Sequence, residues 1–171
     1  DNNGFFYSRY PEPKNKLESV NENQKLYYHQ IGTPQEHDRL IYESPERPKR
    51  GWGSSVSESG DTLFIYGWEG TGERNTLYTL DLQNENAEVV KLMDAFDASY
   101  SVLGERVYTD DRNWLQRLFG SKLQPPETRY WIQTNKDAPN GRIFAVNPEL
   151  PQEENWTEII PESTHVLRGA S

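Results

Sequence analysis

Hydrophobic and polar residues alternate between Asp61 and Leu82, and this stretch is the best-defined element of the chain. The first arm alternates through residues 63–68, and the second arm, residues 77–82, places leucines and a tyrosine between polar residues. A period of two is typical of half-buried β-strands, and the Gly-Thr-Gly sequence between the arms is typical of a turn. The pattern therefore predicts a β-hairpin.

Shorter segments on both sides extend this hairpin to four strands. Residues 54–57 form a strand candidate that ends in the turn sequence Glu58-Ser59-Gly60-Asp61, and residues 87–93 form another candidate. Four consecutive strands joined by short turns predict an antiparallel meander.

The same unit recurs twice, which indicates a repeat architecture. Upstream, three strand candidates occupy residues 4–11, 24–32 and 39–43, so this unit lacks its opening strand; downstream, four occupy residues 97–104, 129–137, 141–148 and 155–161. The spacing from Leu26 to Leu77 is about 50 residues, as in four-stranded propeller blades. We therefore predict an all-β fold of consecutive four-stranded antiparallel blades, a partial β-propeller.

The repeats also predict blade boundaries. Residues 1–48 form a blade without its first strand, residues 49–96 a complete blade, residues 97–163 a blade with an insert, and residues 164–171 the start of a further strand.

The insert covers residues 105–127 and departs from the repeat. Within it, Asn113 is a candidate N-cap for a short helix over residues 113–119, which carries Trp114, Leu115, Leu118 and Phe119 on one face. This face either packs within the blade or forms a surface for a partner.

Composition and charge narrow the classes of partner. Of the 171 residues 33% are hydrophobic, the net charge is −9, and no basic run is longer than the segment from Arg47 to Arg50, so we expect no nucleic-acid partner. The absence of cysteine excludes disulfides, zinc–thiolate sites and thiol nucleophiles. No segment has the pattern of a membrane span, so we expect no membrane partner.

No residue pattern predicts catalysis, a metal site or a cofactor. The nucleophile motif Gly-X-Ser-X-Gly and a glycine-rich phosphate loop are both absent. His29, His37 and His165 lack the spacing of metal ligands, and the pairs Asp110-Asp111 and Glu153-Glu154 are expected to be solvated. We therefore predict no catalytic residues, no metal and no cofactor.

Four segments together resemble the N-terminal propeller of the prolyl oligopeptidase family of serine peptidases. They are NQKLYYHQIGTPQEHDRLIYE (residues 23–43), PERPKRGWGSSVSESGDTLFIYGWEGT (residues 45–71), FDASYSVLG (residues 96–104) and TNKDAPNGRIFAVN (residues 134–147). Their order and spacing match the family over nearly the whole chain, except in the insert. The alternative is a free-standing β module that binds a peptide or a protein.

The resemblance implies a function that this chain does not perform alone. In the family, a closed propeller of about seven blades covers an α/β-hydrolase domain that holds the catalytic Ser, Asp and His. The propeller admits short peptides, which are cut after proline, and excludes folded proteins. The implied partners are therefore the α/β-hydrolase domain and a short peptide substrate, and the implied compartment is the cytoplasm.

The resemblance also implies candidates for residues that line the substrate channel. The positions that fall at the inner turns of the blades are Gly51, Trp52, Trp68, Glu69 and Thr71. For Trp52, which lies between two glycines, packing between blades is the alternative to a place in the channel.

Closure of the ring sets a further expectation. A propeller needs about four to eight blades, so three blades leave two unpaired blade faces. Such faces expose apolar surface and strand edges that favour association. We therefore expect a fragment, self-association through the open blade faces, or an arc that is capped in another way.

Overall fold

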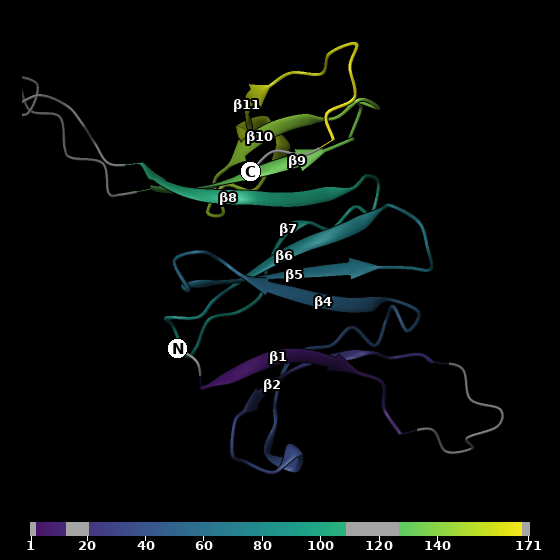
Figure 1. Cartoon of the computed structure of the whole chain (residues 1–171), viewed down its shortest axis with the longest axis vertical. Helices are drawn as coiled ribbons and strands as arrows, with labels where there is room; N and C mark the ends of the chain where they lie inside the picture. Colours follow the sequence, from purple (N-terminus) through teal and green to yellow (C-terminus); the bar gives the residue numbers. More distant parts are fainter. Residues whose placement is uncertain (1–2, 13–20, 109–126, 169–171) are drawn as a thin grey trace, which may run out of the picture. The chain divides into compact units, whose positions relative to one another are not determined.

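The computed structural model describes residues 3–12, 21–108 and 127–168 (Figure 1). The chain divides into two compact units, Asp1–Tyr100 and Ser101–Ser171. The described residues form β-strands and short 3-10 turns and contain no α-helix. Within this part of the chain, no helix is long and apolar enough to cross a membrane. The helix predicted over residues 113–119 lies outside the described residues.

The first unit contains two antiparallel sheets, and each is a simple meander (Figure 1). The 3-10 turn η1 (Gln35–His37) precedes the last strand of the first sheet. That sheet has the order β1 (Gly4–Arg9), β2 (Lys25–Gln30), β3 (Arg39–Tyr42), and the second sheet has the order β4 (Gly51–Val56), β5 (Thr62–Trp68), β6 (Asn75–Asp81), β7 (Val90–Met93).

A third antiparallel sheet is built mainly by the second unit. Its order is β11 (Thr157–Ile160), β10 (Arg142–Val146), β9 (Glu127–Thr134), β8 (Tyr100–Tyr108), and η2 (Glu153–Asn155) lies between β10 and β11 along the chain. Both ends of the predicted insert are strand, since β8 continues to Tyr108 and β9 begins at Glu127. These sheets confirm the predicted fold class of consecutive antiparallel blades.

The segment after β11 belongs to none of the three sheets as far as residue 168. It folds back onto the turn between β9 and β10, where the Leu167 N–H donates to the Asn140 carbonyl at 2.6 Å and the Gln133 amide donates to the Leu167 carbonyl at 2.8 Å. The strand that the repeat predicts over residues 164–171 stays a prediction.

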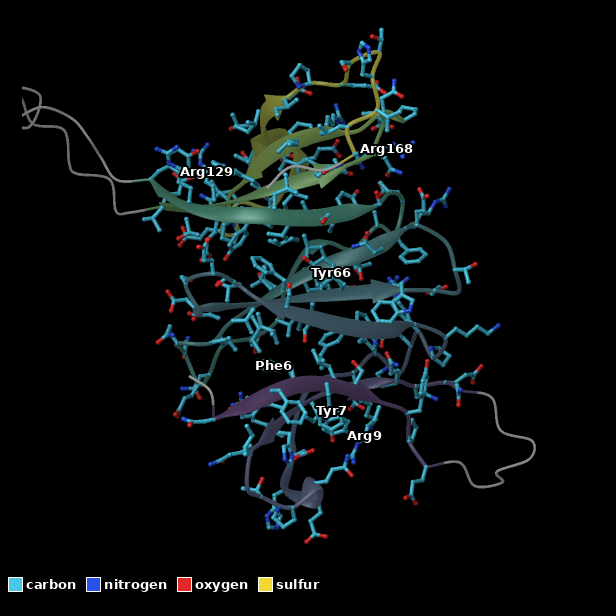
Figure 2. The ribbon with its side chains drawn as sticks, viewed as in Figure 1. Phe6, Tyr7, Arg9, Tyr66, Arg129 and Arg168 are labelled. Atoms are coloured by element: carbon cyan, nitrogen blue, oxygen red, sulfur yellow. The ribbon has the colours of Figure 1, made fainter. Side chains whose placement is uncertain are left out.

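The hydrophobic core of the first unit lies between its two sheets. Phe6 and Tyr7 point to opposite sides of β1, and Phe6 packs against this core (Figure 2). Tyr42 meets the rings of Trp52 and Tyr78 edge-on, with centroids 4.7 Å and 5.6 Å away. The central cluster of buried side chains consists of Leu26, Trp52, Leu63, Ile65 and Tyr78.

Gly67 makes room for Trp52 in this core. The two residues pair across the β4–β5 ladder, and Trp52 is only 1% exposed. A Cβ atom at position 67 would lie 2.5 Å from both Trp52 Cζ3 and Thr76 Oγ1, which is closer than non-bonded atoms approach. The close packing of Trp52 therefore depends on the missing side chain.

A buried carboxylate joins the residue after η1 to the first sheet. The Asp38 side chain has no exposed surface; the Tyr7 hydroxyl donates to its Oδ2 at 2.5 Å, and His29 Nδ1 lies 2.7 Å from its Oδ1. Burial alone would raise the pKa of Asp38, but the hydrogen bonds from Tyr7 and His29 stabilise the carboxylate and hold this pKa below its ordinary value. Burial and the contact with Asp38 raise the pKa of Tyr7.

We expect Gly67→Ala to destabilise the chain, because the added methyl group must displace Trp52, Thr76 or Arg50. Overpacking of this kind costs about 1–3 kcal/mol in free energy of unfolding. Urea unfolding of the 171-residue chain measures the change. Gly72→Ala is the matched control, because nothing lies within 4 Å of a Cβ atom there. Equal effects of the two substitutions would contradict the steric explanation.

We expect Asp38→Asn to lower stability at neutral pH and to flatten its dependence on acid pH. Because the folded-state pKa of Asp38 is depressed, its contribution is complete above the unfolded pKa of about 4 and is lost as the pH falls through the lower folded value. The thermal midpoint, followed downward from neutral pH, should therefore fall more steeply below about pH 4 in the wild type than in the variant.

Glu58→Gln is the control for this substitution, because Glu58 is exposed and makes no hydrogen bond with the described residues. Its pH profile should match that of the wild type. The explanation is wrong if Glu58→Gln flattens the profile as much as Asp38→Asn does.

Candidate functional site

The candidate site lies at one end of the second sheet, where β4 begins and β5 ends. Gly51 pairs with Trp68 across this end, and Trp68 pairs with Asn75 at the start of β6. We call this region the tip, and it comprises Arg50, Gly51, Trp68, Glu69 and the turn over residues 70–74. Gly70, with a φ of 61°, opens the turn in a left-handed conformation that favours glycine.

Trp68 forms a flat aromatic surface at the tip. Its ring lies over two glycines of β4: a Cβ atom would come 2.8 Å from the ring at Gly51 and 3.0 Å from it at Gly53. Side chains at these positions would lift the indole off the sheet. The ring is therefore held against β4 while Trp68 remains 39% exposed.

Trp52 lies on the opposite face of β4 from this surface. Its neighbours are the core side chains between the two sheets, and 1% of it is exposed. In this structure Trp52 packs between the two sheets of the first unit, and its place in a substrate channel stays a prediction. Of the five predicted channel residues, Gly51, Trp68 and Glu69 meet at the tip, and Thr71 is exposed in its turn.

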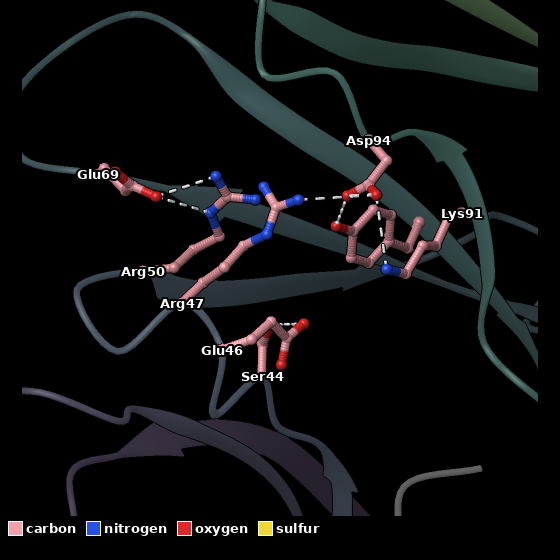
Figure 3. A network of polar contacts seen from close by, with 8 residues as sticks. Ser44, Glu46, Arg47, Arg50, Glu69, Lys91 and Asp94 are labelled. Carbon is pink, nitrogen blue, oxygen red and sulfur yellow. Dashed lines mark hydrogen bonds and ion pairs between the residues drawn. The ribbon is translucent and has the colours of Figure 1, made fainter.

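Arg50 is a buried cation at the tip that the sequence analysis did not single out. Its side chain is 2% exposed, and its Nε and Nη2 donate to Glu69 Oε1 at 3.1 Å and 2.9 Å (Figure 3). The ring of Phe96 covers the guanidinium, with its centroid 4.4 Å from Cζ. The remaining nitrogen, Nη1, is buried and has no hydrogen-bond partner among the described residues.

A second charged group near the tip is organised around Asp94 (Figure 3). The Tyr78 hydroxyl donates to its Oδ1, while Lys91 Nζ and Arg47 Nη2 lie 3.5 Å and 3.9 Å from its Oδ2. Burial would raise the pKa of Asp94, but the bond from Tyr78 and the two cations outweigh it and lower the pKa. Burial, together with Asp94, raises the pKa of Tyr78. This group joins the core to the segment that leads to Phe96.

The tip presents an aromatic ring, a half-exposed carboxylate and a buried guanidinium, which are groups suited to stacking and ion pairing. His29 is engaged with Asp38 in the first sheet, and His37 and His165 are exposed elsewhere. Among residues 3–12, 21–108 and 127–168, no group of three or more His, Asp or Glu side chains is arranged to hold a metal ion.

Known proteins resemble this chain over nearly its whole length. Residues 1–170 match the family model of the prolyl oligopeptidase N-terminal beta-propeller domain. Prolyl oligopeptidase A of Amanita bisporigera is 33% identical over 95% of this chain, and the prolyl endopeptidase of Elizabethkingia meningoseptica is 30% identical over 96%. In both cases the chain spans 20% of the relative's length.

Solved structures show the same fold. A structure from a mechanistic study of two prolyl endopeptidases matches with a TM-score of 0.70 and 28% identity, over 95% of this chain and 20% of the other. The apo prolyl oligopeptidase B of Galerina marginata matches with a TM-score of 0.69 and 24% identity over the same shares, a likeness of fold. The chain therefore belongs to the prolyl oligopeptidase family, as part of its N-terminal β-propeller domain.

Proposed function

We propose that this chain is part of the propeller that filters substrates for a serine peptidase that cleaves short peptides after proline. The observation that carries the proposal is the match of residues 1–170 to the family's propeller model. Relatives named prolyl oligopeptidase and prolyl endopeptidase are about five times as long as this chain, which spans 20% of each. The proposed catalytic Ser, Asp and His lie in an α/β-hydrolase domain outside this chain.

The tip supports this proposal through the kind of surface it presents. Short proline-containing peptides are extended and stiff, and aromatic grooves recognise them without a large loss of conformational entropy. The half-exposed ring of Trp68 is fixed on Gly51 and Gly53, so it is an ordered platform for a pyrrolidine ring. We propose that Trp68, Glu69 and Thr71 face the substrate, while Gly51 and Trp52 support them from within the sheet.

If the propeller filters substrates and the hydrolase domain cleaves them, activity measurements can distinguish the two parts. We expect the full-length protein to release a chromogenic group from a glycyl-prolyl substrate, and the 171-residue chain alone to release none. Replacement of the serine in the Gly-X-Ser-X-Gly motif of the hydrolase domain should abolish turnover. Turnover by the isolated chain, or a full-length protein that never cuts after proline, would overturn the proposal.

Trp68→Ala in the full-length protein tests the substrate-facing role of the tip. Loss of one aromatic contact worth about 1–1.5 kcal/mol should raise KM for an octapeptide with internal prolines roughly fivefold to tenfold. Activity toward a single-proline chromogenic substrate should change much less, because that substrate is too short to reach the blade. Val90→Ala is the control, because Val90 is 42% exposed but lies on β7, the strand farthest from β4 in the sheet. Equal changes in both variants, or for both substrates, would count against the role.

A further inference from the structure

Arg50 is held in place on several sides at the tip. Its side chain crosses Gly67, where a Cβ atom would come within 2.9 Å of Arg50 Cδ. Phe96 covers the guanidinium and does so with a φ of 56°, a backbone conformation that is rare for a bulky residue. Strained backbone of this kind often accompanies a binding site. The guanidinium is therefore held in one position and almost fully excluded from solvent.

The hydrogen bonds of this guanidinium are incomplete. An arginine has five N–H donors in a planar fork that matches the two oxygens of a carboxylate. Here a single oxygen, Glu69 Oε1, accepts from both Nε and Nη2, and the part of the chain that the structure describes offers buried Nη1 no acceptor. An unsatisfied buried donor carries a desolvation cost that a better-placed acceptor would remove.

Glu69 is a counter-ion that can exchange. Its side chain is 41% exposed, and its Oε2 accepts no hydrogen bond from the described residues. It directly precedes Gly70, which starts the turn in a left-handed conformation. Because its carboxylate already contacts water, Glu69 needs no desolvation to rotate away from Arg50. This rotation would uncover the guanidinium.

We propose that Arg50 is a binding site for a carboxylate of a peptide, which displaces Glu69 and accepts hydrogen bonds from Nη1 and Nη2, one at each of its two oxygens. The proposal rests on the proposed function only in naming a short peptide as the ligand. Glu69 is an internal mimic of that ligand, and its presence sets the affinity that an incoming carboxylate must exceed.

The Glu69 carboxylate that pairs with Arg50 indicates that the ligand is a carboxylate and not another anion. Glu69 itself shows that a carboxylate fits between Arg50 and solvent. Phe96 covers one face of the guanidinium, and the N–H donors that pair with a carboxylate lie along its edge.

Calorimetry with the full-length protein tests the proposal. Three short peptides without proline serve as probes, so that no turnover is needed: one with a free C-terminal carboxylate, its C-terminal amide, and an amide with a Glu side chain. The measured quantity is the ratio of the Kd of the plain amide to that of each carboxylate peptide. The two carboxylate peptides distinguish a C-terminal from a side-chain source.

Removal of the internal competitor should strengthen binding of the carboxylate. We expect Glu69→Ala to raise this ratio about tenfold, because the ligand then makes charge-assisted bonds with no rival. Arg50→Gln should bring the ratio close to one. Glu73→Ala is the matched control: it removes the same charge from the same turn, and Glu73 is exposed and makes no hydrogen bond with the described residues.

Three outcomes would overturn the proposal. The ratio could fall for Glu69→Ala, it could rise equally for Glu73→Ala, or it could stay near one in both the wild type and Glu69→Ala. The Glu69→Ala result decides even if Arg50→Gln does not fold. A purely structural ion pair predicts loss of stability for Glu69→Ala and no gain in binding. Because the probes are not cleaved, absence of prolyl peptidase activity would refute the proposed function and leave this result standing.

Discussion

The packing of the second sheet depends on two tryptophans of the β4–β5 ladder. Each of them lies over glycine in the neighbouring strand. Trp52 lies opposite Gly67 on one face, and Trp68 lies over Gly51 and Gly53 on the other. Pairing fixes which residues face each other, so an indole can lie flat on the adjacent strand only where that strand has no Cβ atom. One ring therefore completes the core while the other remains half-exposed at the tip.

Position 67 also connects the core with the charged residues of the tip. Because Gly67 has no side chain, the ring of Trp52 can lie against it from one direction and the Arg50 side chain can cross it from another. Arg50 then reaches Phe96 and Glu69, which lie in segments that follow β7 and β5. Hydrophobic packing and the placement of a buried charge thus depend on a single glycine.

The fold was predictable because alternation and the spacing of repeated units are local properties of the sequence. The start of β4 was not predictable in this way. The predicted strand began at residue 54, because Gly51 and Gly53 have low strand propensity. In the structure the strand begins at Gly51, and the ring of Trp68 packs on both glycines from the partner strand. Arg50 was missed for a related reason. It belongs to a basic, proline-containing run typical of a solvated linker, and its burial is decided by Gly67 and Phe96, which are distant in sequence.

Stability alone does not explain a charge at position 50. Removing a guanidinium from water costs several kcal/mol, and a half-exposed carboxylate returns only part of that cost. The left-handed backbone of Phe96 adds roughly 1–3 kcal/mol of strain. An apolar side chain between Gly67 and Phe96 would avoid the charge burial and the unsatisfied Nη1. The proposed carboxylate site at Arg50 would give this cost a reason that folding alone does not.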